Sequence, residues 1–320
     1  MKSPYKALFM ALMVSSTLMV LSSSNWLVMW MGLEINMMGF IPLMFMRETP
    51  NESETAVKYL IPQSMGSTIF IAAAMLATFL DSTQLLMAIA MCLKLGAAPL
   101  HLWFPPVMFG LELAPAFILL TWQKIAPIFI INALDQNVTN KIILIASVSA
   151  IWGGIGGLNQ TDIRSLLTYS SIAHTGWMIA SITANTQTLL VYITTYVLIN
   201  LSIYQALTKT PTKFHSQLFS WNQNKNLLIL TVSILSLAGL PPFTGFIMKL
   251  LVIYTAKASI LTITSLILGA LISLFFYLSL AFSPILKLAK SRTKLQDSGG
   301  SPIFFALSQI LPLSFLLFFI

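Results

Sequence analysis

Residues 165–208 read SLLTYSSIAHTGWMIASITANTQTLLVYITTYVLINLSIYQALT, a stretch without a single Lys, Arg, Asp or Glu. A transmembrane helix needs about 20 mainly apolar residues. The stretch is therefore long enough for two such helices, and the polar residues near Ala184–Thr188 predict the turn between them. A transmembrane β-barrel would show short alternating segments instead of such long continuous runs. These residues predict an all-α polytopic membrane protein.

The composition of the whole chain agrees with this prediction. Of its 320 residues, 57% are hydrophobic and 8% are charged, and the mean hydropathy is +0.86. Soluble domains carry about 25% charged residues, so this chain has too little polar material to cover a surface in water. The single cysteine, Cys92, excludes a disulfide framework and any Cys-based zinc or iron–sulfur site. In so apolar a chain, the net charge of +8 indicates orientation in a membrane rather than binding to nucleic acid.

Stretches between charged residues predict about eleven transmembrane helices in one integral membrane domain, residues 1–320. The predicted spans lie at 7–33 and 35–46 (two helices divided at Ser22–Asn25), 59–80, 81–135 (two helices), 142–161, 165–208 (two helices), 226–256, 258–286 and 302–320.

The distribution of Lys and Arg between alternate loops provides an independent check on these spans. One side collects twelve residues and the other collects only Lys141 and Lys257; Lys94, Lys124 and Lys249 fall within spans, which accounts for all 17. Because cytoplasmic loops carry an excess of Lys and Arg, we expect the N-terminus on the cytoplasm-like side, the matrix in a mitochondrion, and the C-terminus opposite. The twelve are Lys2, Lys6, Arg47, Lys58, Arg164, Lys209, Lys213, Lys225, Lys287, Lys290, Arg292 and Lys294.

Four charged residues lie inside or beside the predicted spans: Glu34, Lys94, Lys124 and Lys249. Placing a charge at the centre of a membrane helix costs about 2.5–3.5 kcal/mol on insertion scales, so each residue needs a partner, a hydrated cavity or a function. The alternative for each is a side chain that extends to the membrane surface, or a structural ion pair. Lys124 has no acidic residue near it in sequence, since Glu112 and Asp135 are eleven or more residues away.

The helices that carry Lys94 and Lys249 also contain helix-breaking motifs. Lys94 is followed by Gly96-Ala-Ala-Pro99, and Lys249 follows Ala238-Gly-Leu-Pro-Pro242. Proline removes a backbone donor and clashes with the preceding turn, so we expect discontinuous helices at about 84–102 and 226–256. Paired breaks in two halves indicate an inverted repeat with a functional site at its centre. The expected repeats cover about 5–134 and 139–284, followed by a C-terminal helix at about 302–320.

Two of the three histidines also fall in predicted spans. His101 comes seven residues after Lys94, which is two turns along the same face of a continuous helix. His174 ends the polar stretch Leu167-Thr-Tyr-Ser-Ser-Ile-Ala-His174. Imidazoles can pass protons near neutral pH, although a histidine that only hydrogen-bonds two helices remains an alternative for both. His215 lies in a polar loop and is expected to be solvated.

A glycine-rich stretch, Gly153-Gly-Ile-Gly-Gly157, invites a nucleotide-binding interpretation. It lies within or at the end of an apolar helix, however. Small residues there allow neighbouring helices to approach closely, so we predict a packing role for these glycines.

Several of these segments occur together, in order, in one family. The chain resembles the subunit 2 family of mitochondrial NADH:ubiquinone oxidoreductase (respiratory complex I), an antiporter-like family. The segments that carry the resemblance are Trp30-Met-Gly-Leu-Glu34-Ile-Asn36, Lys94-Leu-Gly-Ala-Ala-Pro99-Leu-His101-Leu-Trp103, Thr121-Trp-Gln-Lys124-Ile-Ala-Pro127, Asn159-Gln-Thr161, Tyr169-Ser-Ser-Ile-Ala-His174 and Gly239-Leu-Pro-Pro-Phe-Thr-Gly245 through Lys249.

The resemblance implies a fold of fourteen helices with inverted five-helix repeats, of which animal members typically lack the first three. It also implies roles in proton transfer. Glu34 would tune Lys94, Lys124 would be the central lysine of a hydrated axis, Lys249 would be the terminal proton site, and His101 and His174 would bridge the axis. The segment after about residue 255 matches less distinctively.

The resemblance further implies a location and partners. The chain would lie in the mitochondrial inner membrane among other membrane-arm subunits, including neighbouring antiporter-like subunits, with accessory subunits and phospholipids around it and no nucleic acid. It would bind no cofactor or metal itself, whereas the whole complex would use NADH, FMN, iron–sulfur clusters and ubiquinone to transfer electrons in other subunits.

Two other functions remain open from the sequence. One is a stand-alone cation/proton antiporter of the same superfamily, which a purified single chain exchanging Na⁺ for H⁺ in liposomes would reveal. The other is a subunit derived from a pump that now only supports assembly.

Overall fold

The computed structural model describes residues 4–45, 50–77, 83–208, 224–241, 243–256 and 259–290, and this part of the chain is built from helices, with no β-strand element. The eleventh predicted span, at 302–320, lies outside the described residues, as does His215. The helices are α1 (Pro4–Ser22), α2 (Trp26–Met44), α3 (Pro50–Leu76), α4 (Thr83–Leu95), α5 (Phe104–Gly110), α6 (Leu113–Thr121), the 3₁₀ turn η1 (Trp122–Lys124), α7 (Ile125–Asn132), α8 (Gln136–Gly157), α9 (Ile163–Ile182), α10 (Thr186–Thr208), α11 (Asn224–Ala238), α12 (Thr244–Thr255) and α13 (Ile260–Lys290).

Many of these helices have the length and composition of membrane spans. Within the described residues, seven segments qualify as candidate spans, with Leu113–Asn132 counted as one, whereas α4, α11 and α12 are shorter apolar helices. Large apolar side chains also point outward, as the exposed fractions of Leu102 (77%) and Ile260 (82%) show. Side chains of this kind suit a surface surrounded by lipid. The prediction of an all-α polytopic membrane protein is confirmed.

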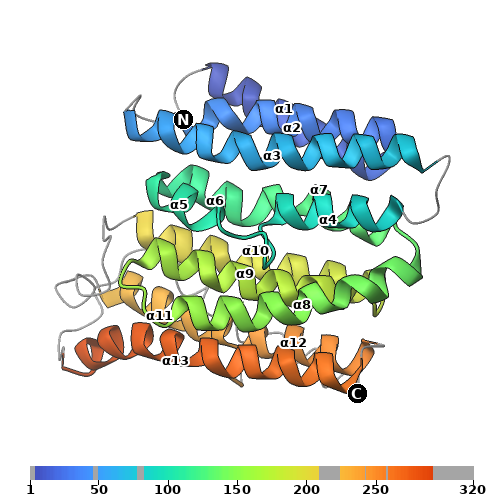
Figure 1. Cartoon of the computed structure of the whole chain (residues 1–320). Coiled ribbons are helices and arrows are strands. Elements are labelled where there is room, and N and C mark those ends of the chain that lie inside the picture. Colours follow the sequence, from blue (N-terminus) through green and yellow to red (C-terminus); the bar gives the residue numbers. More distant parts are fainter. Residues whose placement is uncertain are drawn as a thin grey trace. The chain divides into compact units, whose positions relative to one another are not determined.

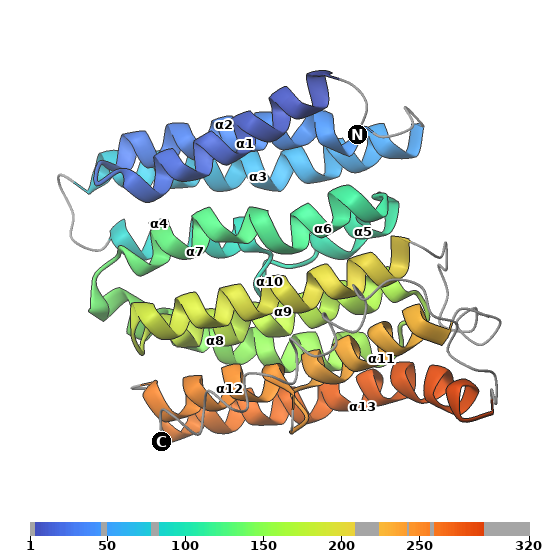
Figure 2. The same cartoon turned by 180° about the vertical axis from the view of Figure 1, so that it is seen from behind.

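The chain forms two compact units, Met1–Ser149 and Ala150–Ile320, and α8 passes from the first into the second. In the first unit, α1, α2 and α3 lie side by side (Figures 1 and 2), and α3 also packs against α4 and α5. Close approach of α1 and α2 depends on small residues: a Cβ added at Gly39 would lie 3.2 Å from the backbone N of Met13. Helices in membranes associate through such contacts.

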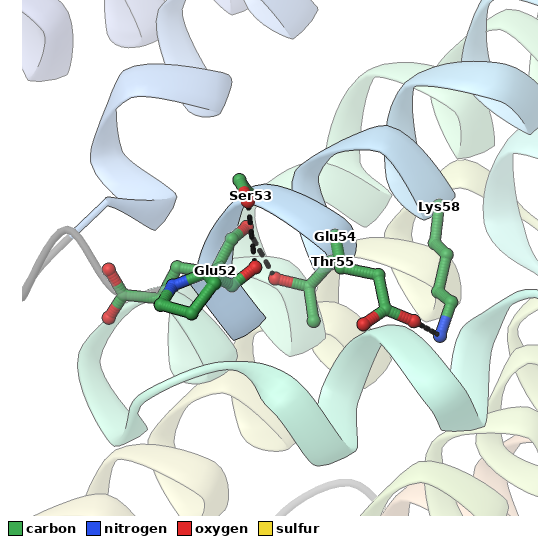
Figure 3. A network of polar contacts seen from close by, with 6 residues as sticks. Glu52, Ser53, Glu54, Thr55 and Lys58 are labelled. Atoms are coloured by element: carbon green, nitrogen blue, oxygen red, sulfur yellow. Dashed lines mark hydrogen bonds and ion pairs between the residues drawn. The ribbon is translucent and has the colours of Figure 1, made fainter.

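Helix α3 begins nine residues earlier than the predicted span at 59–80, and its first turns are polar (Figure 3). Pro50 occupies the first position, where its missing N–H costs nothing. The hydroxyls of Ser53 and Thr55 donate to the carbonyls of Pro50 (2.7 Å) and Glu52 (2.8 Å), and Lys58 pairs with Glu54 at 2.6 Å. Residues four apart on a helix are neighbours on its surface, so this pair is local to the first turns. Local polar contacts therefore extend the helix beyond its apolar part.

In the second unit, the glycines of α8 pack against two neighbours, as predicted for the stretch 153–157. A Cβ at Gly153 would lie 2.5 Å from the backbone N of Ala173 on α9, and one at Gly154 would lie 3.0 Å from the carbonyl oxygen of Gly269 on α13. Helix α10 packs against α9, α11 and α12, and α13 packs against α9 and α11. This unit surrounds α9, whose residues 170–182 are all buried.

Candidate functional site

The first predicted interruption occurs where expected, directly after Lys94. Helix α4 ends at Leu95, Gly96 adopts a left-handed φ of 67°, and helical structure resumes only at Phe104. Interrupting a helix inside a membrane leaves carbonyls without partners. Here side chains supply the donors: Trp103 Nε1 donates to the carbonyl of Leu93 (3.1 Å), and Gln63 Nε2 donates to the carbonyl of Lys94 (3.1 Å).

Lys94 is buried in the last turn of α4, against α3. Its side chain passes over Gly66, where an added Cβ would lie 2.8 Å from Lys94 Cγ and 3.3 Å from Cε. The half-buried Glu34 of α2 interacts electrostatically with Lys94. The pairing of these two residues, which the resemblance implies, remains a prediction.

Lys124 lies at a third interruption, which the sequence analysis did not predict. Its helix changes to the 3₁₀ turn η1 at Trp122–Lys124 and resumes as α7 at Ile125. Pro127 explains the change, because its ring clashes with the carbonyl four residues earlier, that of Gln123. A short 3₁₀ segment within an α-helix often marks a functional hinge. Pro127, three residues after Lys124, was the feature of the sequence from which this interruption could have been predicted.

The surroundings of Lys124 combine an aromatic ring with an amide network. Its ammonium lies 5.8 Å from the centroid of the Phe104 ring, and its side chain is buried. Beside it, Gln123 Nε2 donates to Asn36 Oδ1 (3.2 Å) on α2, and the Tyr59 hydroxyl lies 3.5 Å from Gln123 Oε1. The network ties η1 to α2 and α3. The sequence analysis assigned no role to its three members, and no local pattern could have paired residues from three helices.

His101 lies in the turn between α4 and α5, where it is buried. The expectation that it shares a helical face with Lys94 is wrong. Seven-residue spacing gives a common face only in a continuous helix, and the helix ends between the two residues at Leu95.

The second predicted interruption separates α11 from α12. Helix α11 ends at Ala238, Gly239 has a left-handed φ of 81°, and α12 begins at Thr244. The buried Lys249 of α12 reaches back across this break, and its Nζ donates to the carbonyls of Leu237 (3.2 Å) and Ala238 (2.9 Å). A cation is favoured at these carbonyls because the C-terminal end of a helix carries partial negative charge. The ammonium of Lys249 is therefore held at the break between α11 and α12.

His174 lies in the middle of α9 and is buried. Its Nδ1 lies 2.7 Å from the hydroxyl of Tyr192 on α10, and its ring contacts that of Tyr196 at a centroid distance of 5.2 Å. Helix α10 also packs against α12, so the helices that bear His174 and Lys249 share a neighbour. The sequence analysis did not identify Tyr192.

These residues are divided between the two units. Lys94, Glu34, His101 and Lys124 belong to the first unit, and His174 and Lys249 belong to the second. Within the described residues, no three His, Cys, Asp or Glu side chains gather as metal ligands would.

Comparison with known proteins agrees with this arrangement. Residues 23–276 match the family described as NADH:quinone oxidoreductase/Mrp antiporter, TM. The chain is 37% identical over 299 residues to NADH-ubiquinone oxidoreductase chain 2 of Oryctolagus cuniculus, covering 88% of this chain and 85% of the relative. It belongs to the NADH-ubiquinone oxidoreductase chain 2 family.

Two further comparisons extend this result. The chain 2 protein of Myxine glutinosa is 38% identical over 307 residues, covering 89% of this chain and 87% of the relative. A chain of respiratory complex I from Thermus thermophilus superposes with a TM-score of 0.82 at 22% identity, covering 97% of this chain and 77% of that one. The antiporter-like fold of the chain 2 family is therefore the fold of this chain.

Proposed function

We propose that this chain is a membrane-arm subunit of respiratory complex I and carries protons across the mitochondrial inner membrane. The observation that carries the proposal is the position of its buried lysines. Lys94, Lys124 and Lys249 each lie at an interruption of a membrane helix. Buried charge and interrupted backbone are both costly in a membrane and both mark ion pathways.

The three lysines have different surroundings, which suits a directional relay. The Glu34 carboxylate acts on Lys94, a ring face acts on Lys124, and helix-end carbonyls hold Lys249. Each of these groups stabilises the charged ammonium, whereas removal from water favours the neutral amine. Movement of one of these groups toward or away from its lysine would thus cause that lysine to take up or release a proton.

In this proposal, protons pass along Glu34, Lys94, Lys124 and Lys249, with His101 and His174 bridging the lysines through water. The N-terminus would face the matrix and the C-terminus the intermembrane space, as the distribution of Lys and Arg indicates.

The redox reaction would take place in other subunits. The single cysteine of the chain does not suit an iron–sulfur cluster, which uses four cysteine ligands, and we assign no site here for NADH, FMN or ubiquinone. The partners would be the other membrane-arm subunits, including antiporter-like neighbours, together with accessory subunits and phospholipids.

Substitution of Lys249 tests the proposal in the intact complex. Lys249→Met keeps an unbranched side chain, shorter by one atom, and removes the ammonium with its bonds to Leu237 and Ala238. We expect assembled complex whose proton pumping in vesicles falls severalfold. Lys141→Met, at an exposed lysine, is the matched control and should pump normally. Normal pumping by the Lys249→Met complex would contradict the assigned role.

A further inference from the structure

A tyrosine hydroxyl that has no role in the proposed lysine relay lies beside His174. One imidazole nitrogen, Nδ1, lies 2.7 Å from the hydroxyl oxygen of Tyr192, within the range of a good hydrogen bond. Both side chains are buried, with 2% of His174 and 0% of Tyr192 exposed. Because Tyr192 occupies the Nδ1 side, a proton that arrives at Nε2 produces an imidazolium whose Nδ1–H points at the tyrosine oxygen.

The neighbouring rings hold this pair in place. Tyr196, one turn beyond Tyr192 on α10, contacts the His174 ring at 5.2 Å between centroids. The Tyr192 and His174 rings lie 6.1 Å apart with an interplanar angle of 54°. Two aromatic side chains of α10 thus fix the orientation of the His174 imidazole on α9. A fixed orientation is needed for proton transfer through one particular ring nitrogen.

Further hydroxyl groups lie near this pair within the second unit. Ser171 lies beside the Tyr196 hydroxyl, and Ser170 lies beside the hydroxyl of Tyr277 on α13. Both serines donate their own protons to backbone carbonyls, those of Thr168 (2.7 Å) and Leu167 (2.8 Å). These hydroxyls make the surroundings of the pair polar.

Resting on the proposed function, we infer that Tyr192 is the proton-transfer partner of His174 at Nδ1. A proton that reaches Nε2 is matched by transfer of the Nδ1 proton to Tyr192 Oη, while the tyrosine's original hydroxyl proton passes to a water molecule. One proton enters and one leaves, so His174 and Tyr192 both end neutral, with the imidazole in its other tautomer. Before the next transfer, the His174 ring must return to the tautomer protonated at Nδ1, and the Tyr192 hydroxyl must return to its starting orientation.

A purely structural role is the alternative to consider, because a buried tyrosine usually finds some hydrogen-bond partner. A structural tyrosine would affect the amount of folded subunit. A relay tyrosine affects the number of protons moved by a complex that has already assembled. The two roles therefore predict different results for removal of the hydroxyl alone.

Tyr192→Phe in the intact complex provides the test. It keeps the ring and removes only the hydroxyl that contacts Nδ1. We expect normal assembly on native gels and unchanged NADH oxidation with an artificial acceptor that bypasses quinone. Quinone-linked proton pumping in vesicles should fall about tenfold or more, since a positioned proton-transfer group contributes about 10²–10⁴-fold to a rate. Tyr204→Phe, on the same helix, is the control and should pump normally.

A parallel His174→Gln variant separates this inference from the proposed function. Loss of pumping in both His174→Gln and Tyr192→Phe supports the inference. Loss in His174→Gln with normal pumping in Tyr192→Phe overturns it and leaves the proposed function standing. Normal pumping in both overturns the inference and removes His174 from the proposed relay. A reduced amount of Tyr192→Phe complex with normal pumping per assembled complex would show a structural role only and would also overturn it.

Discussion

At the scale of single residues, the buried charges are each compensated in a different way. Lys249 donates to two backbone carbonyls, Lys94 interacts with a carboxylate, and Lys124 lies near an aromatic face. Hydrogen bonds that involve a charged group contribute about 1.5–3 kcal/mol each, comparable to the cost of placing a lysine in a membrane helix. These contacts favour the charged form of each lysine against the cost of its burial.

The pairing of Glu34 with Lys94 leads to a prediction about charge alone. Glu34→Gln keeps the shape of the side chain but removes the negative charge that acts on Lys94. We expect assembled complex with severalfold slower quinone-linked pumping. The exposed Glu54, which pairs with Lys58, supplies the control Glu54→Gln. Equal pumping by the two variants would show that Glu34 does not influence Lys94 during turnover.

The amide network beside Lys124 should act as a unit. Asn36→Leu and Gln123→Leu each remove one half of the 3.2 Å contact. Residues in one hydrogen-bond network show interaction energies of about 0.5–3 kcal/mol, so the double variant should pump about as well as the poorer single variant. Pumping rates of the four complexes measure this coupling. Losses that simply add on a logarithmic scale would indicate that the network does not position Lys124.

At the scale of helices, three interruptions define the site, and each has a local cause. Gly96 and Gly239 adopt left-handed backbone angles, which glycine tolerates and other residues rarely do. Pro127 changes the geometry of the turn at Lys124. Side chains then satisfy the exposed carbonyls, as Gln63 and Trp103 do after α4.

Close packing at the second interruption predicts a strong effect of a small substitution. A Cβ added at Gly245 would lie 1.5 Å from the carbonyl oxygen of Ser236, so α11 and α12 would have to separate. Gly245→Ala should sharply reduce the amount of assembled complex on native gels. Thr264→Ala, at an exposed position of α13, is the control. Full assembly of the Gly245→Ala complex would show that the break tolerates rearrangement.

The elements show how far sequence reasoning extends. Apolar runs and glycine–proline motifs predict the spans and the breaks at Lys94 and Lys249, because these depend on residues close together in the chain. The early start of α3 depends on polar contacts near Pro50 that an apolar count ignores. The contact between His174 and Tyr192 depends on which face of α10 packs against α9, and the tertiary structure alone decides it.

At the scale of the whole molecule, the Lys and Arg residues of the loops predict the orientation of the chain in the membrane. Twelve Lys and Arg residues fall on one predicted side of the membrane and two on the other. We therefore expect a tag at the N-terminus to be accessible only from the matrix side of sealed inner membranes, and a tag at the C-terminus only from the opposite side. Both tags on one side would contradict the eleven-helix arrangement.

The central claim is that Lys124 carries protons in the assembled complex, and Lys124→Met tests it most directly. The variant keeps an unbranched side chain, shorter by one atom, and removes the charge at the interrupted helix. Lys124→Arg should also fail, because a guanidinium does not release its proton in this range. The decisive measurement is proton pumping per NADH oxidised in vesicles that contain the assembled Lys124→Met complex. We expect a normal amount of complex with strongly reduced quinone reduction and pumping, whereas normal pumping would contradict a role for Lys124 in proton transfer.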